Sequence, residues 1–394
     1  MVKEHASRVV VISDYQEGPF DEEPRPSVEW YRDKWQAVPQ AAGQVEISDF
    51  PVEGSYLERL PLACVKSGLV DEAEIWTHWR GGELPSEPRD VTSPLRRRAF
   101  QMNGFAAPFN SNDMIGHIQA FGAPELLCVW GLGVSEDVMA ACSSSFKIYN
   151  SIDAPSLRVP FEVGRHFDLV ITGAEWQSDE VRQVYPDVET IVLPIGPEFA
   201  SPTMFGPLPL EKIYDVIYIA AAQPYKRHDI LFDALAKFPR KLKALCVCGY
   251  GELVDDLKAM ADRLAVDVDF IEPPGVSYSA LNKLINQSRL GVVCGIDDGA
   301  PAIITEYMLA GIPVLANAKL KCGLQYIRRE TGVTRTAENF HTGFADILGD
   351  IGRFSPRQAV LENWVWQHSI EKLTNAILST KKGRHIFKGK EQRF

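Results

Sequence analysis

The sequence predicts an α/β protein built from two Rossmann-like, doubly wound domains. Its 394 residues exceed one ordinary hydrophobic core and fit two domains of about 150 to 200 residues each. Short β-branched runs alternate with stretches of helical periodicity, and this alternation starts again after a proline-rich segment near the middle of the chain. Such a pattern is typical of parallel sheets covered by helices.

The strands expected in the first domain are short apolar runs that end at polar, glycine or proline residues. The first is RVVVISDY, which stops at QEGPF, and a helix-like stretch, SDEVRQVY, precedes the last of them. The order strand, helix, strand therefore recurs in this half of the chain. The expected strands span residues 8–15, 73–79, 126–131, 146–151, 168–173 and 189–196.

A linker is expected at residues 197–213, which contain four prolines and no clear period. We therefore place a first Rossmann-like domain at 1–200 and a second Rossmann-like domain at 201–362. Residues 363–394 are expected to form a helix that crosses back to the first domain, followed by a basic tail. In the second domain, strands are expected at 215–222, 243–251, 267–275, 290–296 and 313–317, and helices at 228–238, 252–266, 277–288 and 302–311.

Composition limits the possible partners and the cellular location. The net charge of −11 and the pI near 5.3 argue against a nucleic-acid partner. No apolar run approaches the roughly 20 residues that span a bilayer, and the N-terminal run is too short for a signal peptide. The seven cysteines lie mostly in strand-like runs, so we expect reduced core residues in a cytoplasmic protein. The basic tail KKGRHIFKGKEQRF allows a weak contact with an anionic membrane surface, with a solvated end as the alternative.

The stretch DDGAPAIITEYMLAGIPVLAN, from Asp297 to Asn317, predicts a ligand-binding loop. It follows an expected strand, so it lies at the carboxyl edge of a parallel sheet, where such sheets bind ligands. Pro301 is expected in the first helical turn, and small neighbours leave backbone N–H groups open to a phosphate. Asp298 and Glu306 would then accept hydrogen bonds from hydroxyls on either side of that phosphate. The alternative is an ordinary capped helix whose second carboxylate faces solvent.

Two further features follow other strands of the same expected sheet. Lys226 and Arg227 come after the strand at 215–222, and Gly249 and Gly251 form a flexible turn at the end of the run at 243–251. A cation pairs with phosphate charge, and glycines allow close backbone approach. The meeting of three such features at one sheet edge predicts a phosphate-containing ligand.

These segments resemble the family 4 retaining glycosyltransferases of the GT-B fold. DGAPAIITEYMLAGIPVLA follows the family's Glu-x7-Glu signature, with aspartate at the first acidic position. IAAAQPYKRHDILFDAL is similar to the family's segment ending P-x-K-G-x-D-x-L. VCGYGELVDDLKAMADRL resembles its Gly-x-Gly turn and following helix, and DLVITGAEWQSDEVRQVYPDVETIVLPIGPEF resembles the end of its first domain.

The resemblance implies two Rossmann-like domains facing across a cleft and a transferase activity. A sugar would pass from a nucleotide diphosphate sugar, with a UDP-hexose as first candidate, to a hydroxyl acceptor with retention of configuration. The acceptor would be a sugar, a lipid-linked sugar or a small molecule in polysaccharide or glycoconjugate synthesis. Neither a metal nor another cofactor is expected. Two alternatives stay open: a non-catalytic nucleotide-sugar-binding subunit, and a nucleotide-sugar epimerase of the same fold.

The resemblance also assigns roles to individual residues. Glu306 would bind the ribose, Asp298 the sugar hydroxyls and Lys226 the leaving diphosphate, with Asp153 as a further catalytic candidate. Other donor-binding positions would be Arg227, Gly249, Gly251, Glu272, Pro273, Gly299, Ala300, Pro301, Ala302, Ile303 and Gly18.

The chain departs from the family pattern at several positions. Asp298 is one methylene shorter than the usual glutamate, and Ala221 stands where an arginine is common, so Arg227 would have to replace it. Asp153 lacks the histidine that often precedes it, and YQEGPFDEEPRP replaces the usual Gly-Gly loop. Candidates on the acceptor side, each with core packing as the alternative, are His78, His117, Trp79 and Trp130.

Overall fold

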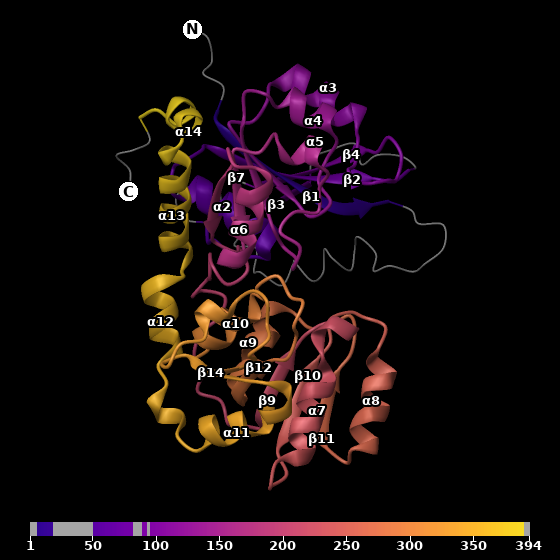
Figure 1. Cartoon of the computed structure of the whole chain (residues 1–394), viewed down its shortest axis with the longest axis vertical. Coiled ribbons are helices and arrows are strands. Elements are labelled where there is room, and N and C mark those ends of the chain that lie inside the picture. The colour runs from indigo at the N-terminus through magenta and orange to yellow at the C-terminus, as the bar shows by residue number, and fades with distance from the viewer. Residues whose placement is uncertain (1–5, 19–49, 82–88, 93–94, 390–394) are drawn as a thin grey trace. The chain divides into compact units, whose positions relative to one another are not determined.

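The computed structural model describes residues 6–18, 50–81, 89–92 and 95–389 (Figure 1). The chain divides into two compact units. Among the described residues, those up to Ile195 and those from Trp366 onward make the N-terminal unit, and Gly196–Val365 makes the C-terminal unit. The last helices of the chain therefore belong to the unit that the first strands build.

The N-terminal unit contains an eight-stranded sheet with the order β3-β4-β2-β1-β5-β6-β7-β8. Strand β3 pairs antiparallel with β4, and the other pairings are parallel. The central strands are buried on both faces, which explains their unbroken apolar runs. The strands are β1 Arg8–Glu17, β2 Glu72–Trp79, β3 Arg89–Thr92, β4 Leu95–Gln101, β5 Leu126–Trp130, β6 Phe146–Asn150, β7 Leu169–Thr172 and β8 Glu189–Val192.

Helices from both ends of the sequence cover this sheet. The C-terminal helix α13 packs against α2, and Lys382 of α14 donates to Asp168 at 2.8 Å, next to β7. The chain's end is therefore anchored on the N-terminal unit. The helices are α2 Tyr56–Lys66, α3 Asn112–Phe121, α4 Glu136–Ala141, α5 Phe161–Gly164, α6 Glu175–Val184, α13 Trp366–Ser379 and α14 Lys381–Ile386.

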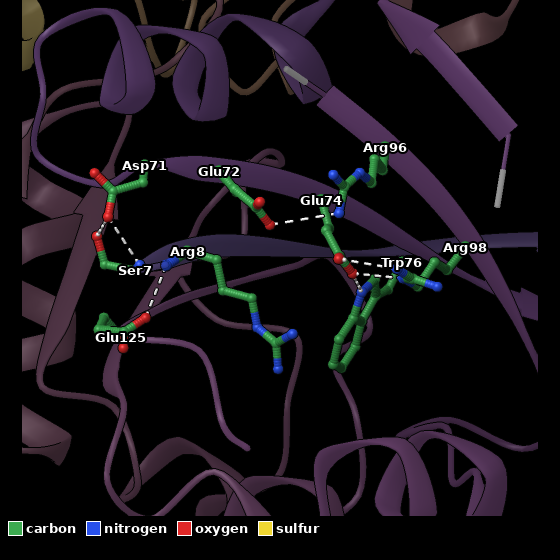
Figure 2. A network of polar contacts seen from close by, with 9 residues as sticks. All are labelled: Ser7, Arg8, Asp71, Glu72, Glu74, Trp76, Arg96, Arg98 and Glu125. Carbon is green, nitrogen blue, oxygen red and sulfur yellow. Dashed lines mark hydrogen bonds and ion pairs between the residues drawn. The ribbon is translucent and has the colours of Figure 1, made fainter. Parts of the chain in front are cut away.

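A buried ionic network joins β4, the strand next to edge strand β3, to β2 (Figure 2). The Glu74 carboxylate is only 2% exposed, and it accepts from Trp76 Nε1 at 2.7 Å and from Arg98 Nε at 2.8 Å. Burial raises the pKa of Glu74, but the bonds from Arg98 and Trp76 outweigh it, so the net pKa lies below its ordinary value. Glu72 and Arg96 form a second pair between the same strands, at 3.4 Å and largely exposed.

The C-terminal unit contains a six-stranded parallel sheet with the order β11-β10-β9-β12-β13-β14. From β9 the chain proceeds outward to β10 and β11, then returns to β12 on the other side of β9. The carboxyl ends of β9 and β12 therefore flank a topological switch point. The strands are β9 Tyr214–Ile219, β10 Lys243–Val247, β11 Asp267–Ile271, β12 Ser288–Val293, β13 Val314–Asn317 and β14 Gly332–Arg335.

Two apolar cores lie on the two faces of this sheet. One includes Ile217, Val293 and Tyr307 on the side of α9, α10 and α12; the other includes Val216, Phe232 and Val292 on the side of α7, α8 and α11. The helices are α7 His228–Lys237, α8 Val254–Arg263, α9 Tyr278–Asn286, α10 Ile303–Leu309, α11 Phe340–Leu348 and α12 Pro356–Asn363. The predicted pair of doubly wound α/β domains is confirmed.

Several local predictions were wrong. The strand expected at 189–196 ends at Val192, before a loop that contains Pro194. The final helical pattern is interrupted at Val365, which forms a β-bridge with Ala200, so α12 and α13 are separate helices. The beginning of the basic tail is helical, in α14, while its last residues lie outside the described ranges. Most of the stretch YQEGPFDEEPRP also lies outside them.

The buried cysteines and the helix lengths bear on two other expectations. All seven cysteines are free thiols and buried, as expected for core residues. In the described ranges, no helix combines the length and apolar character needed to cross a membrane.

Candidate functional site

The strongest candidate site lies at the switch point of the C-terminal sheet. The loop after β9 contains the short 3₁₀ helix Pro224–Lys226, and the loop after β12 contains Asp297–Ala302. Because β9 and β12 are neighbours and parallel, both loops emerge at the same edge. The structure therefore brings together two segments that the sequence singled out separately.

Lys226 and Asp298 form a direct ion pair between these loops, although 72 positions separate them in the sequence. The side chains are 15% and 13% exposed. The lysine is held on two further sides: its carbonyl accepts from the Tyr218 hydroxyl at 2.5 Å, and its ammonium lies 4.8 Å from the centroid of the Tyr225 ring. This edge of the sheet thus holds a cation and an anion that are each other's counter-ion and are largely shielded from water.

The loop before α10 turns sharply through Ala300, which has a left-handed backbone with φ of 64° and is buried. Asp298 Oδ1 accepts from Gly299 N at 3.1 Å, which fixes the carboxylate beside the turn. Ala302 precedes the helix as its N-cap, so Pro301 lies outside the first turn where it was predicted. The helix itself is shorter than expected, spanning Ile303–Leu309.

A turn from the start of the C-terminal unit covers part of this backbone. A Cβ on Gly196 would lie 3.0 Å from Ala300 O and 3.1 Å from Ala302 N, so a side chain at this position would require the neighbouring backbone to shift. Thr305 Oγ1 donates to Pro197 O at 3.0 Å and fixes the same turn against α10. The backbone that the sequence predicted to be open to a ligand is therefore packed on one side.

Glu306 lies in the first turn of α10 and is 6% exposed. The alternative in which this carboxylate faces solvent is therefore wrong. Its helix also carries Tyr307, whose hydroxyl accepts from Ile219 N at 2.8 Å and ties α10 to the end of β9. Glu306 and Lys226 consequently belong to segments that are both anchored at the end of the same strand.

The loop after β10 is paired with the loop after β9 through backbone hydrogen bonds. Ala222 N donates to Tyr250 O at 2.8 Å, and Leu253 N donates to Ala222 O at 3.0 Å. Gly251 adopts a φ of 116°, and a Cβ there would lie 2.4 Å from Ala222 O. The predicted meeting of three strand-end features at one edge therefore has a structural basis in this loop pairing.

Replacing Gly251 by alanine is expected to lower the free energy of unfolding by about 2 to 4 kcal/mol, because the new Cβ clashes with backbone and the φ angle disfavours a side chain. Gly249→Ala is the matched control, since nothing lies within 4 Å of a Cβ there. Denaturant unfolding of both variants checks this. Equal stabilities would contradict the contact between the two loops.

Other donor-side candidates have partners of their own. The backbone of Arg227 is in the left-handed region, with φ of 54°. Its guanidinium donates to both Asp229 carboxylate oxygens, at 2.9 and 2.7 Å, and these hydrogen bonds raise the pKa of Arg227. This arginine is engaged by its neighbour, and Ala221 is buried. Glu272 pairs with Lys258. The turn from Glu272 through Pro273 to Gly275 is closed by a 2.9 Å backbone hydrogen bond and lies against Gly249.

The candidates Gly18 and Asp153 lie in the N-terminal unit. Gly18 directly follows the last residue of β1, and a Cβ there would lie 3.3 Å from Arg80 N. Asp153 follows β6 and forms an ion pair with Arg158 at 2.6 Å, with both side chains 40% exposed. Gly18 and Asp153 therefore belong to a different unit from Lys226 and Asp298.

Burial favours core packing for most of the acceptor-side candidates. His78 is fully buried against Phe109, and burial lowers its pKa to about 4, so the ring is neutral at pH 7. His117 packs against Trp76 with ring centroids 5.5 Å apart, and Trp130 is buried and stacked on Tyr56. Trp79 is half-buried, next to Gly18.

Sequence reasoning passed over two tyrosines beside the ion pair. Tyr225 immediately precedes Lys226, and Tyr250 stands between the two glycines of the β10 loop. They are 37% and 58% exposed, which is unusual for rings at a sheet edge. Both tyrosines lie inside segments that had been singled out for other residues, PYK and GYG, and this position could have identified them as candidates.

No group of three or more metal-binding side chains that could hold an ion occurs in the part of the chain that the structure describes. The Lys226 ammonium is the cation that the candidate site itself provides.

Comparisons with known proteins bear on the fold, which is GT-B, and on the segment that contains the candidate site. Residues 203–344, which lie within the C-terminal unit, match the family model described as Glycosyl transferases group 1. The match includes the Lys226 and Asp298 loops and Glu306. A search of curated protein sequences finds no match.

Solved structures with the same fold match along nearly the whole chain. Sucrose-phosphate synthase from Thermosynechococcus elongatus has a TM-score of 0.65 and 13% identity, covering 95% of this chain and 99% of its own. HepE from Anabaena, in complex with UDP and glucose, has a TM-score of 0.65 and 12% identity, and the match covers 95% of this chain and 100% of HepE. The apo form of the lipopolysaccharide outer core galactosyltransferase WaaB has a TM-score of 0.59 and 12% identity, and the match covers 94% of this chain and 99% of WaaB.

Proposed function

We propose that the chain is a retaining glycosyltransferase that moves a sugar, first of all a hexose, from a UDP-sugar to a hydroxyl acceptor. The observation that carries the proposal is the Lys226–Asp298 pair. This pair lies at the switch point of a parallel sheet, inside the segment that matches the Glycosyl transferases group 1 model. The Glu306 carboxylate belongs to the first turn of α10, the helix that follows the Asp298 loop.

The ion pair suggests how the donor would bind. A diphosphate carries more negative charge than one carboxylate, so it would displace Asp298 from the Lys226 ammonium. The released Asp298 carboxylate would accept hydrogen bonds from sugar hydroxyls, and Glu306 would bind the ribose. Arg227 is engaged by Asp229, so Lys226 would provide the main diphosphate charge partner.

The chemical step follows from this binding. As the bond from the anomeric carbon to the β-phosphate oxygen breaks, its electrons pass to the diphosphate, whose new charge Lys226 stabilises. The acceptor oxygen bonds to the anomeric carbon on the same face, and its proton passes to the departing phosphate oxygen. Asp153 is proposed as a group on the acceptor side. Because Lys226 supplies the charge, activity is expected to persist in EDTA.

A nucleotide-release assay with UDP-, GDP-, ADP- and TDP-sugars, with EDTA and with Glu306→Ala as comparison, tests the proposal. We expect UDP release from one donor, and a roughly 10- to 100-fold weaker UDP affinity in Glu306→Ala, because a charged hydrogen-bond acceptor is lost. Equal UDP affinity in both proteins would refute the ribose assignment.

The same assay separates the alternatives. UDP-sugar binding with no release under any donor and acceptor would indicate a binding subunit, and formation of an epimeric UDP-sugar would indicate an epimerase. Anomer analysis of the product by NMR tests retention, since an inverted product would contradict the same-face step.

A further inference from the structure

Tyr225 lies next to the proposed donor-binding lysine. The Lys226 ammonium is 4.8 Å from the centroid of the Tyr225 ring, and the tyrosine is 37% exposed. The loop after β9, which carries both residues, is tied to the loop after β10 by the hydrogen bond from Ala222 N to Tyr250 O. The ring therefore belongs to a loop that is fixed to its neighbour.

The lysine has two attractive partners of different kinds. The Asp298 carboxylate attracts it by charge, and the Tyr225 ring attracts it through the negative face of its π-system. A diphosphate competes with the carboxylate for the ammonium, but it does not compete with the ring. The ring can therefore keep the ammonium at this edge of the sheet while its anionic partner changes.

We propose that Tyr225 is a positioning residue for donor binding. Its ring holds the Lys226 ammonium where the donor's diphosphate arrives. This inference rests on the proposed function, because the diphosphate is the ligand that it concerns. Tyr225 acts through Lys226, so it should affect affinity for the second phosphate more than affinity for the nucleoside.

Calorimetric binding of UDP and of UMP to the full chain tests the proposal. Tyr225→Ala is expected to weaken UDP binding about tenfold, the range of a partly desolvated cation–π contact, while UMP affinity changes less than about twofold. The donor KM should rise by a similar factor with kcat nearly unchanged, since the ring aids ground-state and transition-state binding equally. Tyr225→Phe keeps the ring and should retain most of the UDP affinity.

The outcomes separate this inference from the proposed function. Wild-type UDP affinity in Tyr225→Ala, with wild-type protein that binds UDP and releases it from a donor, would overturn the inference alone. A parallel loss of UMP and UDP affinity would also overturn it, because it would show general damage to the loop. Failure of the wild-type protein to bind UDP would overturn both.

Discussion

Replacing Lys226 by alanine is expected to lower kcat for sugar transfer by about 10²- to 10³-fold, the cost of removing one group that stabilises charge in a transition state. The lysine is the proposed partner of the leaving diphosphate, and Arg227 is already engaged by Asp229. Removing the ammonium also leaves the Asp298 carboxylate, only 13% exposed, without its counter-ion, which opposes entry of an anionic donor. Steady-state kinetics with the donor found in the release assay measures the effect.

A second lysine of the same unit provides the control. Lys243 begins β10, at the amino edge of the sheet, and pairs with Asp269 at 3.0 Å on the surface. Lys243→Ala should retain kcat within about twofold, because an exposed pair of this kind contributes about 1 kcal/mol or less to stability. Retention of most of the kcat by Lys226→Ala, or equal losses in the two variants, would contradict the assignment of Lys226.

Replacing Glu74 by alanine is expected to lower the free energy of unfolding by about 3 to 5 kcal/mol, the usual cost of breaking one side of a buried ion pair. The substitution leaves the Arg98 guanidinium and Trp76 Nε1 without the carboxylate that they share, where β2 pairs with β4. Glu72→Ala removes the exposed pair on the same two strands and should cost less than about 1 kcal/mol. Equal costs in denaturant unfolding would show that the network in Figure 2 does not hold β4.

The pH dependence of this effect has a definite sign. Because the folded pKa of Glu74 lies below its unfolded value, its contribution is fully present above the unfolded pKa and is lost as pH falls through the folded pKa. The stability gap between wild type and Glu74→Gln should therefore narrow in acid. A gap that widens on acidification would contradict the lowered pKa.

The strands that could be predicted from the sequence are those that are buried on both faces of a sheet. Runs such as those of β1, β9 and β12 could be recognised because burial in a parallel sheet requires apolar side chains. Strand β4, with sequence LRRRAFQ, was missed because its arginines are paired with acidic residues. Arg97 meets Glu58 of α2 and Arg98 meets Glu74 of β2, partners that a single-strand pattern does not contain.

The candidate site was predictable in its parts but not in its contacts. The lysine and the acidic pair could be located from their position after strands, yet the ion pair between Lys226 and Asp298 depends on β9 and β12 being neighbours. The pairing of Arg227 with Asp229 depends on a left-handed backbone that nothing in the local composition requires. The hydrogen bond from Ala222 N to Tyr250 O likewise depends on β9 and β10 being neighbours.

The way in which α13 and α14 complete the N-terminal unit determines how the protein can fold during synthesis. Lys382 and Asp168 are separated by 214 positions, and the whole C-terminal unit, Gly196–Val365, lies between α6 and α13 in the sequence. A ribosome therefore releases every residue of the second sheet before it releases the helix that packs on α2. The C-terminal unit can reach its final structure on the emerging chain, whereas the N-terminal unit, although begun first, becomes complete only after the C-terminal unit has been synthesised.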